Sequence, residues 1–297
     1  MTRAAGNEME PRGQSPLTLV TAYFNVGVKP DHPEWGNPYP DWIRNLLPFI
    51  RWPLVIFCDE QSVDMLKEAR GGKPAVYHVT RPEAFYAYRY LDNLKRLPFP
   101  AERAEAFVAC SLIWHEKHHF LRQAMSENPF GSEMFFWCDV GLFRGGRFGL
   151  RLSDGVEWPN LRVCRALPQD KVSLILIYTS TRPAIMGNFF GGAAEPLRRW
   201  CDIYYQCLER CSEEDAFESS DEYVMYSAWQ RRPDAAHLLS HHLVPWIRLV
   251  SFAAGLAGKE VSGHRWYFLS GKRFPWRYFR RRLFSPPPRW RAPSPAE

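Results

Sequence analysis

The sequence predicts an α/β fold in which a mixed, mainly parallel sheet is flanked by helices. Three short apolar segments, 17–24, 53–58 and 75–79, have the composition of buried strands. Helical or loop segments separate them, and a strand–helix–strand–helix–strand order favours a parallel sheet with helices on both faces. The chain has 297 residues, of which 46% are hydrophobic and 24% charged, so it can bury a substantial core.

The first part of the chain alternates strands with helices. The stretch 25–40 is rich in Gly, Pro, Asp and Asn, which predicts a loop, and Asp41 can then cap a helix running to about residue 49. The strand 53–58 ends on the acidic pair Asp59-Glu60. The helix that follows is expected to stop at Gly71-Gly72, because glycine favours helix ends.

The later part of the chain continues this pattern. Residues 102–125 have helical periodicity, with one stripe made of Phe107, Cys110, Ser111, Trp114 and His118. The segment 128–131 breaks that helix. Further strands are expected at 134–138 and 173–178, a short strand or turn at 188–192, and further helices at 193–211 and 221–231.

The net charge of +6 is concentrated near the carboxyl end. Residues 272–297 carry eight Lys and Arg against one acid, which leaves 30 basic and 31 acidic side chains in residues 1–271. A nucleic-acid-binding domain usually carries its basic surface on the folded body, so we expect no nucleic-acid partner. The sequence divides into a flexible N-terminus (1–16), one large domain (17–271) and a basic tail rich in aromatic residues and proline (272–297).

The tail and the cysteines bear on where the protein works. Arginines interleaved with aromatic residues suit an anionic membrane surface, where each basic residue contributes about 1 kcal/mol, although a solvated tail explains them as simply. The seven cysteines include no Cys-x-x-Cys pair, which favours a reduced protein. No apolar run resembles a signal peptide or a membrane span. We therefore expect a cytoplasmic protein that can lie peripherally at the inner membrane face.

Two predicted strands end in an acid, Asp59 and Asp139. In open α/β sheets ligands bind outside the carboxyl ends of parallel strands, where a carboxylate can hold a divalent ion against phosphate oxygens. Gly141 lets the backbone approach a ligand, and Arg144 in the same loop can pair with phosphate. The alternative is that both acids merely cap turns or helices. The nearby Gly141 and Arg144 favour the functional interpretation for Asp139.

Several blocks of the sequence together resemble a known family. They are 18–24, 53–59, 111–117, 128–130 leading into 137–144, and 188–192. In this order and spacing the chain resembles, over about residues 17–230, the HtrL/YibB-like family of bacterial proteins. That family is associated with cell-surface polysaccharide loci and is related to glycosyltransferases of the GT-A fold. The resemblance implies a GT-A-like domain that binds a nucleotide-diphosphate sugar.

The resemblance also implies roles at the donor site. Thr21, Ala22 and Tyr23 would line the nucleoside pocket, and Asp59 would hold the base or the ribose. Lys117 would reach toward the diphosphate. A solvated, charged face of its helix explains Lys117 equally well, because His115, Glu116, His118 and His119 are its neighbours in sequence.

Asp139 stands where such enzymes carry the first Asp of the Asp-x-Asp metal motif, which implies a divalent metal, Mn or Mg. The third position of the motif is Gly141 in this chain. With a single carboxylate at the motif, Lys117 and Arg144 are alternative groups to balance the charge of the diphosphate.

The acceptor side is implied to follow later in the chain. Gly191 and Gly192 would form the floor of the acceptor site. Asp221 and Glu222 stand where the family usually shows an acid followed by an amide, and either could be the general base on an acceptor hydroxyl. Both acids could also simply begin a helix, because acids suit the helix dipole.

A competing metal motif lies in the helix at 102–125. His115, Glu116 and His119 match the His-Glu-x-x-His pattern of zinc metalloproteases. A zinc hydrolase also needs a third ligand and an edge strand above the helix, and the sequence indicates neither.

Together these patterns predict a hexosyltransferase-type glycosyltransferase. It would move a sugar from a nucleotide sugar donor to a cell-surface glycan or lipid-linked acceptor. Catalysis would rest on stabilising the diphosphate leaving group and on a base near the acceptor. The main alternative is a non-catalytic nucleotide- or carbohydrate-binding protein, a degenerate glycosyltransferase, which the missing second Asp favours.

Overall fold

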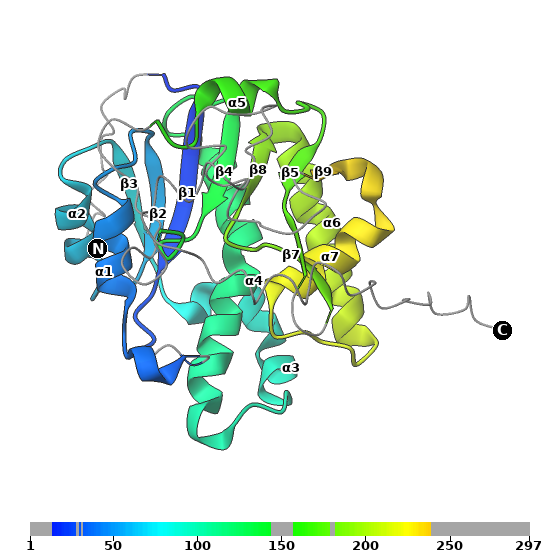
Figure 1. The fold of residues 1–297 in the computed structure, drawn as a ribbon. Coiled ribbons are helices and arrows are strands. Elements are labelled where there is room, and N and C mark those ends of the chain that lie inside the picture. The colour runs from blue at the N-terminus through cyan, green and yellow to red at the C-terminus, as the bar shows by residue number, and fades with distance from the viewer. Residues whose placement is uncertain (1–13, 28–29, 31, 144–156, 179–181, 239–297) are drawn as a thin grey trace, which may run out of the picture. The chain divides into compact units, whose positions relative to one another are not determined.

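The first four strands of the sheet run parallel to one another. The computed structural model describes residues 14–27, 30, 32–143, 157–178 and 182–238. The four strands are β1 (Leu17–Tyr23), β2 (Leu54–Cys58), β3 (Ala75–Val79) and β4 (Met134–Cys138). Their order in space is β3-β2-β1-β4 (Figure 1). The chain therefore builds outward on one side of β1 and then returns to place β4 on the other side.

Three more strands extend the sheet beyond β4. In spatial order they are β8 (Phe189–Ala193), β5 (Val172–Leu174) and β9 (Ala236–Leu238). β8 is antiparallel to both β4 and β5, whereas β5 and β9 are parallel. A separate antiparallel pair joins β6 (Leu176–Tyr178) to β7 (Pro183–Ile185). The predicted mixed, mainly parallel sheet is confirmed, since β8 runs against the other described strands of the seven.

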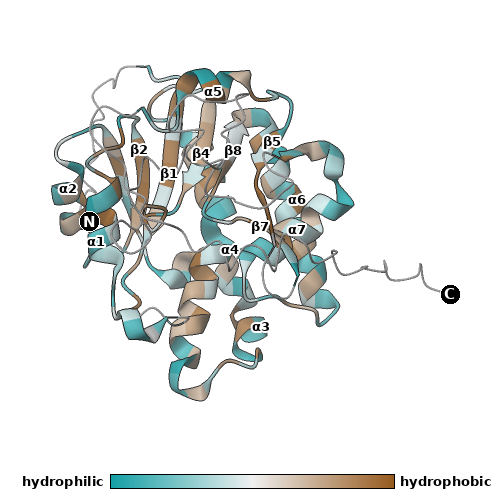
Figure 2. Ribbon diagram, viewed as in Figure 1, coloured by the Kyte–Doolittle hydropathy of each residue, from teal (hydrophilic) through white to brown (hydrophobic). Residues whose placement is uncertain are grey.

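Helices cover both faces of the sheet, as predicted. One face packs against α1 (Tyr39–Leu46), α2 (Val63–Arg70) and α5 (Leu161–Ala166). The other packs against α3 (Leu91–Lys95), α4 (Ala104–Glu127), α6 (Ala194–Glu213) and α7 (Asp221–Arg231). Figure 2 shows β1 and β2 largely in hydrophobic colours. That pattern is expected of parallel strands buried on both faces.

The predicted boundaries need small corrections. α1 begins at Tyr39 rather than after a cap at Asp41, because Pro40 fits the first turn, where its missing N–H costs nothing. Asp41 instead pairs with Arg44 on the surface, at 3.2 Å. The expected strand 173–178 is interrupted at Ile175, whose carbonyl oxygen accepts a hydrogen bond from Met186 N at 2.8 Å.

α4 is buried over most of its circumference, which its sequence did not predict. The expected stripe is only partly right, because Cys110, Ser111 and His118 are buried but Phe107 and Trp114 are half-buried. Lys117 is only 3% exposed, so the alternative that placed it on a solvated face is wrong. The reason is that α4 packs against β1, β4, α6 and α7, which cover its polar residues as well as its apolar ones.

All seven cysteines lie in the described residues and are free thiols, and Cys58 and Cys138 are fully buried as expected of small apolar residues. No helix in the described residues is long and apolar enough to cross a membrane. Residues 1–13 and the basic tail 272–297 lie outside the described residues, so the expectations for them remain untested.

Candidate functional site

The order in which successive strands are added to the sheet reverses between β1 and β4. β1 pairs with β2 on one side and with β4 on the other, and all three strands run parallel (Figure 1). Crossovers that leave a sheet in opposite directions open a crevice outside the carboxyl ends of the strands, where open α/β sheets bind ligands. In this protein the crevice lies between Tyr23, the last residue of β1, and Asp139, the residue after β4.

A cavity opens at this crevice. Its walls come from the end of β1, from α1, from α4 and from the segment after β4. Its aromatic lining residues are Tyr23, Phe24, Tyr39, Trp42, Trp114 and Trp137. Its charged lining residues are Lys117 and Asp139. The volume is about 80 Å³, below the range of roughly 300–1,000 Å³ typical of ligand pockets, so a large ligand would place only one group inside it.

Gly141 is required by the packing of the cavity wall. A Cβ atom at this position would lie 2.8 Å from Cε3 of Trp42, too close for any side chain without movement of the indole ring. The third position of the Asp-x-Asp pattern is therefore glycine in this chain for a steric reason, because a second Asp would displace Trp42.

The ammonium group of Lys117 is surrounded by three oxygen atoms from three separate segments. Nζ donates to the carbonyl oxygen of Gly187 at 2.9 Å and lies 3.0 Å from Oδ2 of Asp221 and 3.4 Å from Oδ1 of Asp139. Burial lowers the pKa of Lys117, but the attraction of Asp139 and Asp221 outweighs burial and raises it overall. Lys117 is therefore a buried, charged group that ties α4 to the end of β4 and to the start of α7.

Asp139 is held from two sides. Its Oδ1 accepts a hydrogen bond from Nε1 of Trp137 at 2.6 Å and faces the Lys117 ammonium. Burial raises the pKa of Asp139, and the Lys117 ammonium opposes that effect. The Asp139 side chain is 30% exposed, so this carboxylate remains accessible from the cavity.

Gly187 links the lysine to the acidic pair at the start of α7, and sequence reasoning missed it. Its carbonyl oxygen accepts from Lys117, and its N–H donates to Oε1 of Glu222 at 3.2 Å. A Cβ atom at Gly187 would lie 2.5 Å from Oδ2 of Asp221, so only glycine fits here without a shift. The signal available in the sequence was weak, because Gly187 merely precedes the predicted strand or turn at 188–192.

Asp221 and Glu222 differ in their surroundings, although both lie in the first turn of α7 as the helix interpretation expected. Asp221 is 2% exposed and faces Lys117. Glu222 is half-buried, and burial together with the negative charge of Asp221 raises its pKa to about 7. Ser220 caps the helix by accepting from Glu222 N, so the two carboxylates are not needed as caps.

The residues expected at the donor site are only partly brought together. Ala22 and Tyr23 line the cavity, whereas Thr21 is fully buried in β1 and is not part of the lining. Asp59 accepts hydrogen bonds from Asn25 N at 2.6 Å and from Ser62 N at 2.8 Å. The turn-capping alternative therefore describes Asp59, which fixes the loop after β1 to the start of α2.

The two glycines expected at the acceptor site lie inside β8. Gly191 pairs with Phe136 and Gly192 with Phe135, farther along the strand than Phe189, which pairs with Cys138 beside Asp139. A Cβ at Gly191 would lie 2.3 Å from the carbonyl oxygen of Phe135, which accounts for this glycine by strand packing. Their acceptor role stays a prediction. Arg144 lies outside the described residues.

The His-Glu-x-x-His segment has structural partners. Nδ1 of His115 lies 2.7 Å from the Tyr204 hydroxyl, and Nε2 lies 2.9 Å from the carbonyl oxygen of Glu218. Glu116 accepts hydrogen bonds from Tyr86 N at 3.0 Å and Ala87 N at 2.7 Å. Because both ring nitrogens of His115 are engaged within the protein, this segment is not arranged as a zinc site.

The donor set at Asp139 does not fit a divalent metal either. Among the residues that the structure describes, no group of three His, Cys, Asp or Glu side chains is placed to hold an ion. The space between Asp139 and Asp221 is taken by the ammonium of Lys117. The expected Mn or Mg ion would have to share or displace that position.

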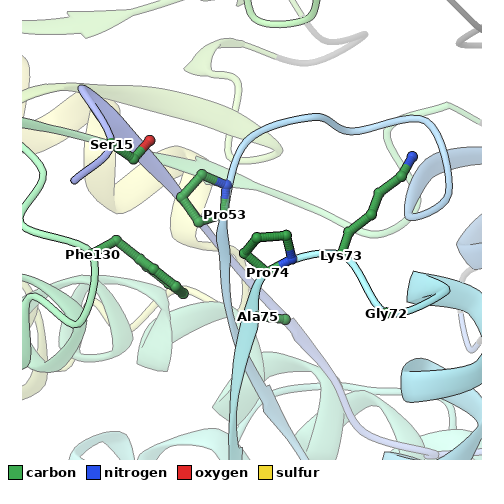
Figure 3. Close-up of a pocket in the computed structure, with 7 residues that line it drawn as sticks. All are labelled: Ser15, Pro53, Gly72, Lys73, Pro74, Ala75 and Phe130. Atoms are coloured by element: carbon green, nitrogen blue, oxygen red, sulfur yellow. The ribbon is translucent and has the colours of Figure 1, made fainter. Parts of the chain in front are cut away.

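A larger hollow of about 450 Å³ lies at the opposite end of the same strands (Figure 3). It is lined by Ser15, Pro53, Gly72, Lys73, Pro74, Ala75 and Phe130. Lys73 supplies its one charged side chain among these and donates to the carbonyl oxygen of Pro48. With no carboxylate and no switch point of the sheet beside it, this hollow is a weaker candidate than the crevice at Asp139.

Known proteins are similar to this chain in structure rather than in sequence. No protein-family model matches the sequence, and no curated protein matches it, so the HtrL/YibB-like resemblance stays a prediction. Among solved structures the chain is similar to core-mannan synthase A from Aspergillus fumigatus in its Mn/GDP form, with a TM-score of 0.43 and 10% identity. The match covers 80% of this chain and 79% of that one. A likeness at this level assigns no activity or ligand to the present chain.

Proposed function

We propose that this protein is a GT-A-like glycosyltransferase that moves a sugar from a nucleotide-diphosphate sugar to a cell-surface glycan or lipid-linked acceptor. The observation that carries the proposal is a buried charged cluster beside an aromatic cavity at the switch point of the sheet. Aromatic rings suit the faces of a sugar or a base, and the cluster supplies charges for a leaving group and an acceptor hydroxyl.

In this proposal the nucleoside lies against the carboxyl end of β1, where Ala22 and Tyr23 line the cavity. Asp59 acts indirectly, by fixing the loop that follows β1. The diphosphate faces Lys117, and Arg144, which lies outside the described residues, stays the second cation that the sequence predicts for it. Lys117 already donates to Gly187 and forms ion pairs with Asp139 and Asp221, so we propose that it stabilises the diphosphate through its charge.

Glu222 is the base we propose for the acceptor. Asp221 is fully buried behind Lys117, whereas Glu222 is half-buried and has a pKa near 7, which suits proton transfer close to neutral pH. The acceptor oxygen would bond to the anomeric carbon as its proton passes to the Glu222 carboxylate. The bond from that carbon to the phosphate oxygen would break, with its electron pair remaining on the nucleoside diphosphate.

A non-catalytic binding protein is the second candidate, and one observation favours it. The site lacks a second carboxylate at position 141, and Lys117, the one cationic side chain among the described lining residues, is already paired with two carboxylates. Such a site would bind a nucleotide or sugar without turning it over.

The test is a thermal-shift panel of nucleotides and nucleotide sugars, followed by an assay for nucleoside diphosphate release. We expect one nucleoside diphosphate class to stabilise the wild type, and Lys117→Met to lower that affinity by about tenfold or more, because the cation that faces the diphosphate is lost. Lys67→Met is the matched control, because Lys67 pairs with Asp64 on the surface at 3.8 Å. Binding with donor turnover supports the transferase, and binding without any turnover supports the second candidate. A flat panel contradicts the transferase and a nucleotide-binding protein alike.

A further inference from the structure

The surroundings of Lys117 have the composition of a cation site. Two carboxylates, Asp139 and Asp221, and the carbonyl oxygen of Gly187 converge on one point from the end of β4, the start of α7 and the turn before β8. Carboxylate and carbonyl oxygens are the ligands that hard cations such as Mg²⁺ and Ca²⁺ take from proteins. Here the ligated cation is an ammonium group covalently attached to α4.

The contacts around Lys117 are those of a charged ammonium group. Nζ donates one hydrogen bond, to the carbonyl oxygen of Gly187 at 2.9 Å, and forms ion pairs with Asp221 at 3.0 Å and Asp139 at 3.4 Å. Metal–oxygen contacts are shorter, at about 2.0–2.6 Å. A divalent ion that used Asp139 and Asp221 would meet the positive charge of Lys117 at close range.

The charge of Lys117 is also secured by its neighbours. The attraction of both carboxylates outweighs burial, which raises the pKa of Lys117, so the side chain remains an ammonium at neutral pH. The lysine is 3% exposed, so its ammonium group is enclosed by the protein together with the two carboxylates.

We propose that the Lys117 ammonium is the resident cation of this site, replacing a divalent metal between Asp139 and Asp221, so that ligand binding at the crevice needs no metal ion. The part of this inference that concerns a nucleoside diphosphate rests on the proposed function. The Mn²⁺-binding experiment below does not rest on it, because that experiment uses no nucleotide.

The first experiment measures Mn²⁺ binding by electron paramagnetic resonance on full-length wild type, Lys117→Ala and Lys117→Ala/Asp139→Asn. We expect no stoichiometric Mn²⁺ on the wild type, one ion on Lys117→Ala, and loss of that ion in the double variant. Lys67→Ala is the matched control, because Lys67 pairs with Asp64 on the surface at 3.8 Å and should leave the wild-type result unchanged. Stoichiometric Mn²⁺ on the wild type that is lost in Asp139→Asn overturns the proposal, as does a folded Lys117→Ala that binds none.

The second experiment decides the question if Lys117→Ala does not fold. The affinity of the wild type for its preferred nucleoside diphosphate is measured in EDTA and in Mn²⁺. We expect the two values to agree within about threefold, less than one ordinary contact is worth. A gain of tenfold or more in Mn²⁺ would overturn the proposal. If no nucleotide binds under either condition, the proposed function fails, and the wild-type Mn²⁺ titration still decides the inference.

Discussion

Glu222 accepts a hydrogen bond from Gly187 N at 3.2 Å and lies next to Asp221. Burial and the charge of Asp221 raise its pKa from 4.5 to about 7, and the Gly187 N–H and Lys117 only partly oppose them. In the folded protein this carboxyl therefore keeps its proton over a range of pH in which the unfolded chain has already lost it. Folding stability is linked to pH through that difference in bound protons.

The first prediction at this scale concerns the pH dependence of stability. As pH rises from about 4.5 to 7 the folded state binds more protons at Glu222 than the unfolded state, so the free energy of unfolding falls. The loss is at most about 3 kcal/mol for a shift of this size. Glu222→Gln keeps the acceptor for Gly187 N but cannot ionise. Urea unfolding measures the free energy of unfolding at each pH. The difference between the variant and the wild type should grow in favour of the variant as pH rises from about 4.5 to 7. A difference that does not change with pH would contradict the raised pKa of Glu222.

The roles of the site residues could be predicted from the sequence at some positions and not at others. Asp139 was predicted because it ends an apolar strand and is followed by Gly141. Gly187 was missed, because its role depends on Asp221 and Lys117, which reach it through the fold. Trp137 was missed although Asp139 is only two positions away, because an apolar strand indicates burial and not a hydrogen bond to a carboxylate. No local spacing connects a lysine in α4 with a glycine 70 positions later.

At the scale of elements, β8 is placed by its glycines. It is antiparallel to β4, and Phe189 at its start pairs with Cys138, which puts Gly187 beside Lys117. Gly191 and Gly192 have nearly equal φ angles of 159° and 158°, so any backbone cost of a side chain is common to both. The two positions differ in the nearest atom to an added Cβ. At Gly191 a Cβ would lie 2.3 Å from the carbonyl oxygen of Phe135, and at Gly192 it would lie 3.2 Å from the carbonyl oxygen of Lys171.

The prediction for this element compares two alanine substitutions. Gly191→Ala forces β8 away from β4 and should destabilise the protein by about 3 kcal/mol or more, whereas Gly192→Ala needs only a small shift and should cost about 1 kcal/mol. Chemical denaturation of both variants measures the difference. Equal losses would show that strand contact does not account for Gly191.

The strands and long helices were predictable because each is one continuous pattern bounded by turn residues. β2 is an unbroken apolar run, and α2 stops at Gly71, which has a left-handed φ of 62°. α4 was predicted as a helix, but its burial was not. His115, Glu116 and Lys117 look solvated in sequence and are buried because Tyr204, the N–H groups of residues 86 and 87, and Asp221 satisfy them.

At the scale of the whole chain, charge is divided unequally. Residues 1–271 are nearly neutral, whereas residues 272–297 carry eight basic side chains and five Trp, Tyr and Phe interleaved with them after residue 274. An acceptor linked to a lipid would lie at a membrane surface. We therefore propose that the tail holds the protein there by its charge, with the folded domain contributing little to the attraction.

The tail proposal predicts which arginines matter for membrane binding. Replacing Arg280, Arg281 and Arg282 with Glu removes at least about 3 kcal/mol of attraction, at about 1 kcal/mol per basic residue, which is roughly a hundredfold in affinity. Co-sedimentation with vesicles containing phosphatidylserine should show this loss, and added salt should weaken the wild type in the same way.

The matched control changes the net charge equally within the folded domain. Arg44, Arg122 and Arg199 are surface residues with side chains 65%, 44% and 55% exposed, and their replacement with Glu should leave most vesicle binding intact. An equal loss in both triple variants would mean that total charge, and not the tail, attracts the protein. Unchanged binding in the tail variant would place the attraction elsewhere in the chain, because a segment that holds the protein by its basic residues cannot lose three of them without effect.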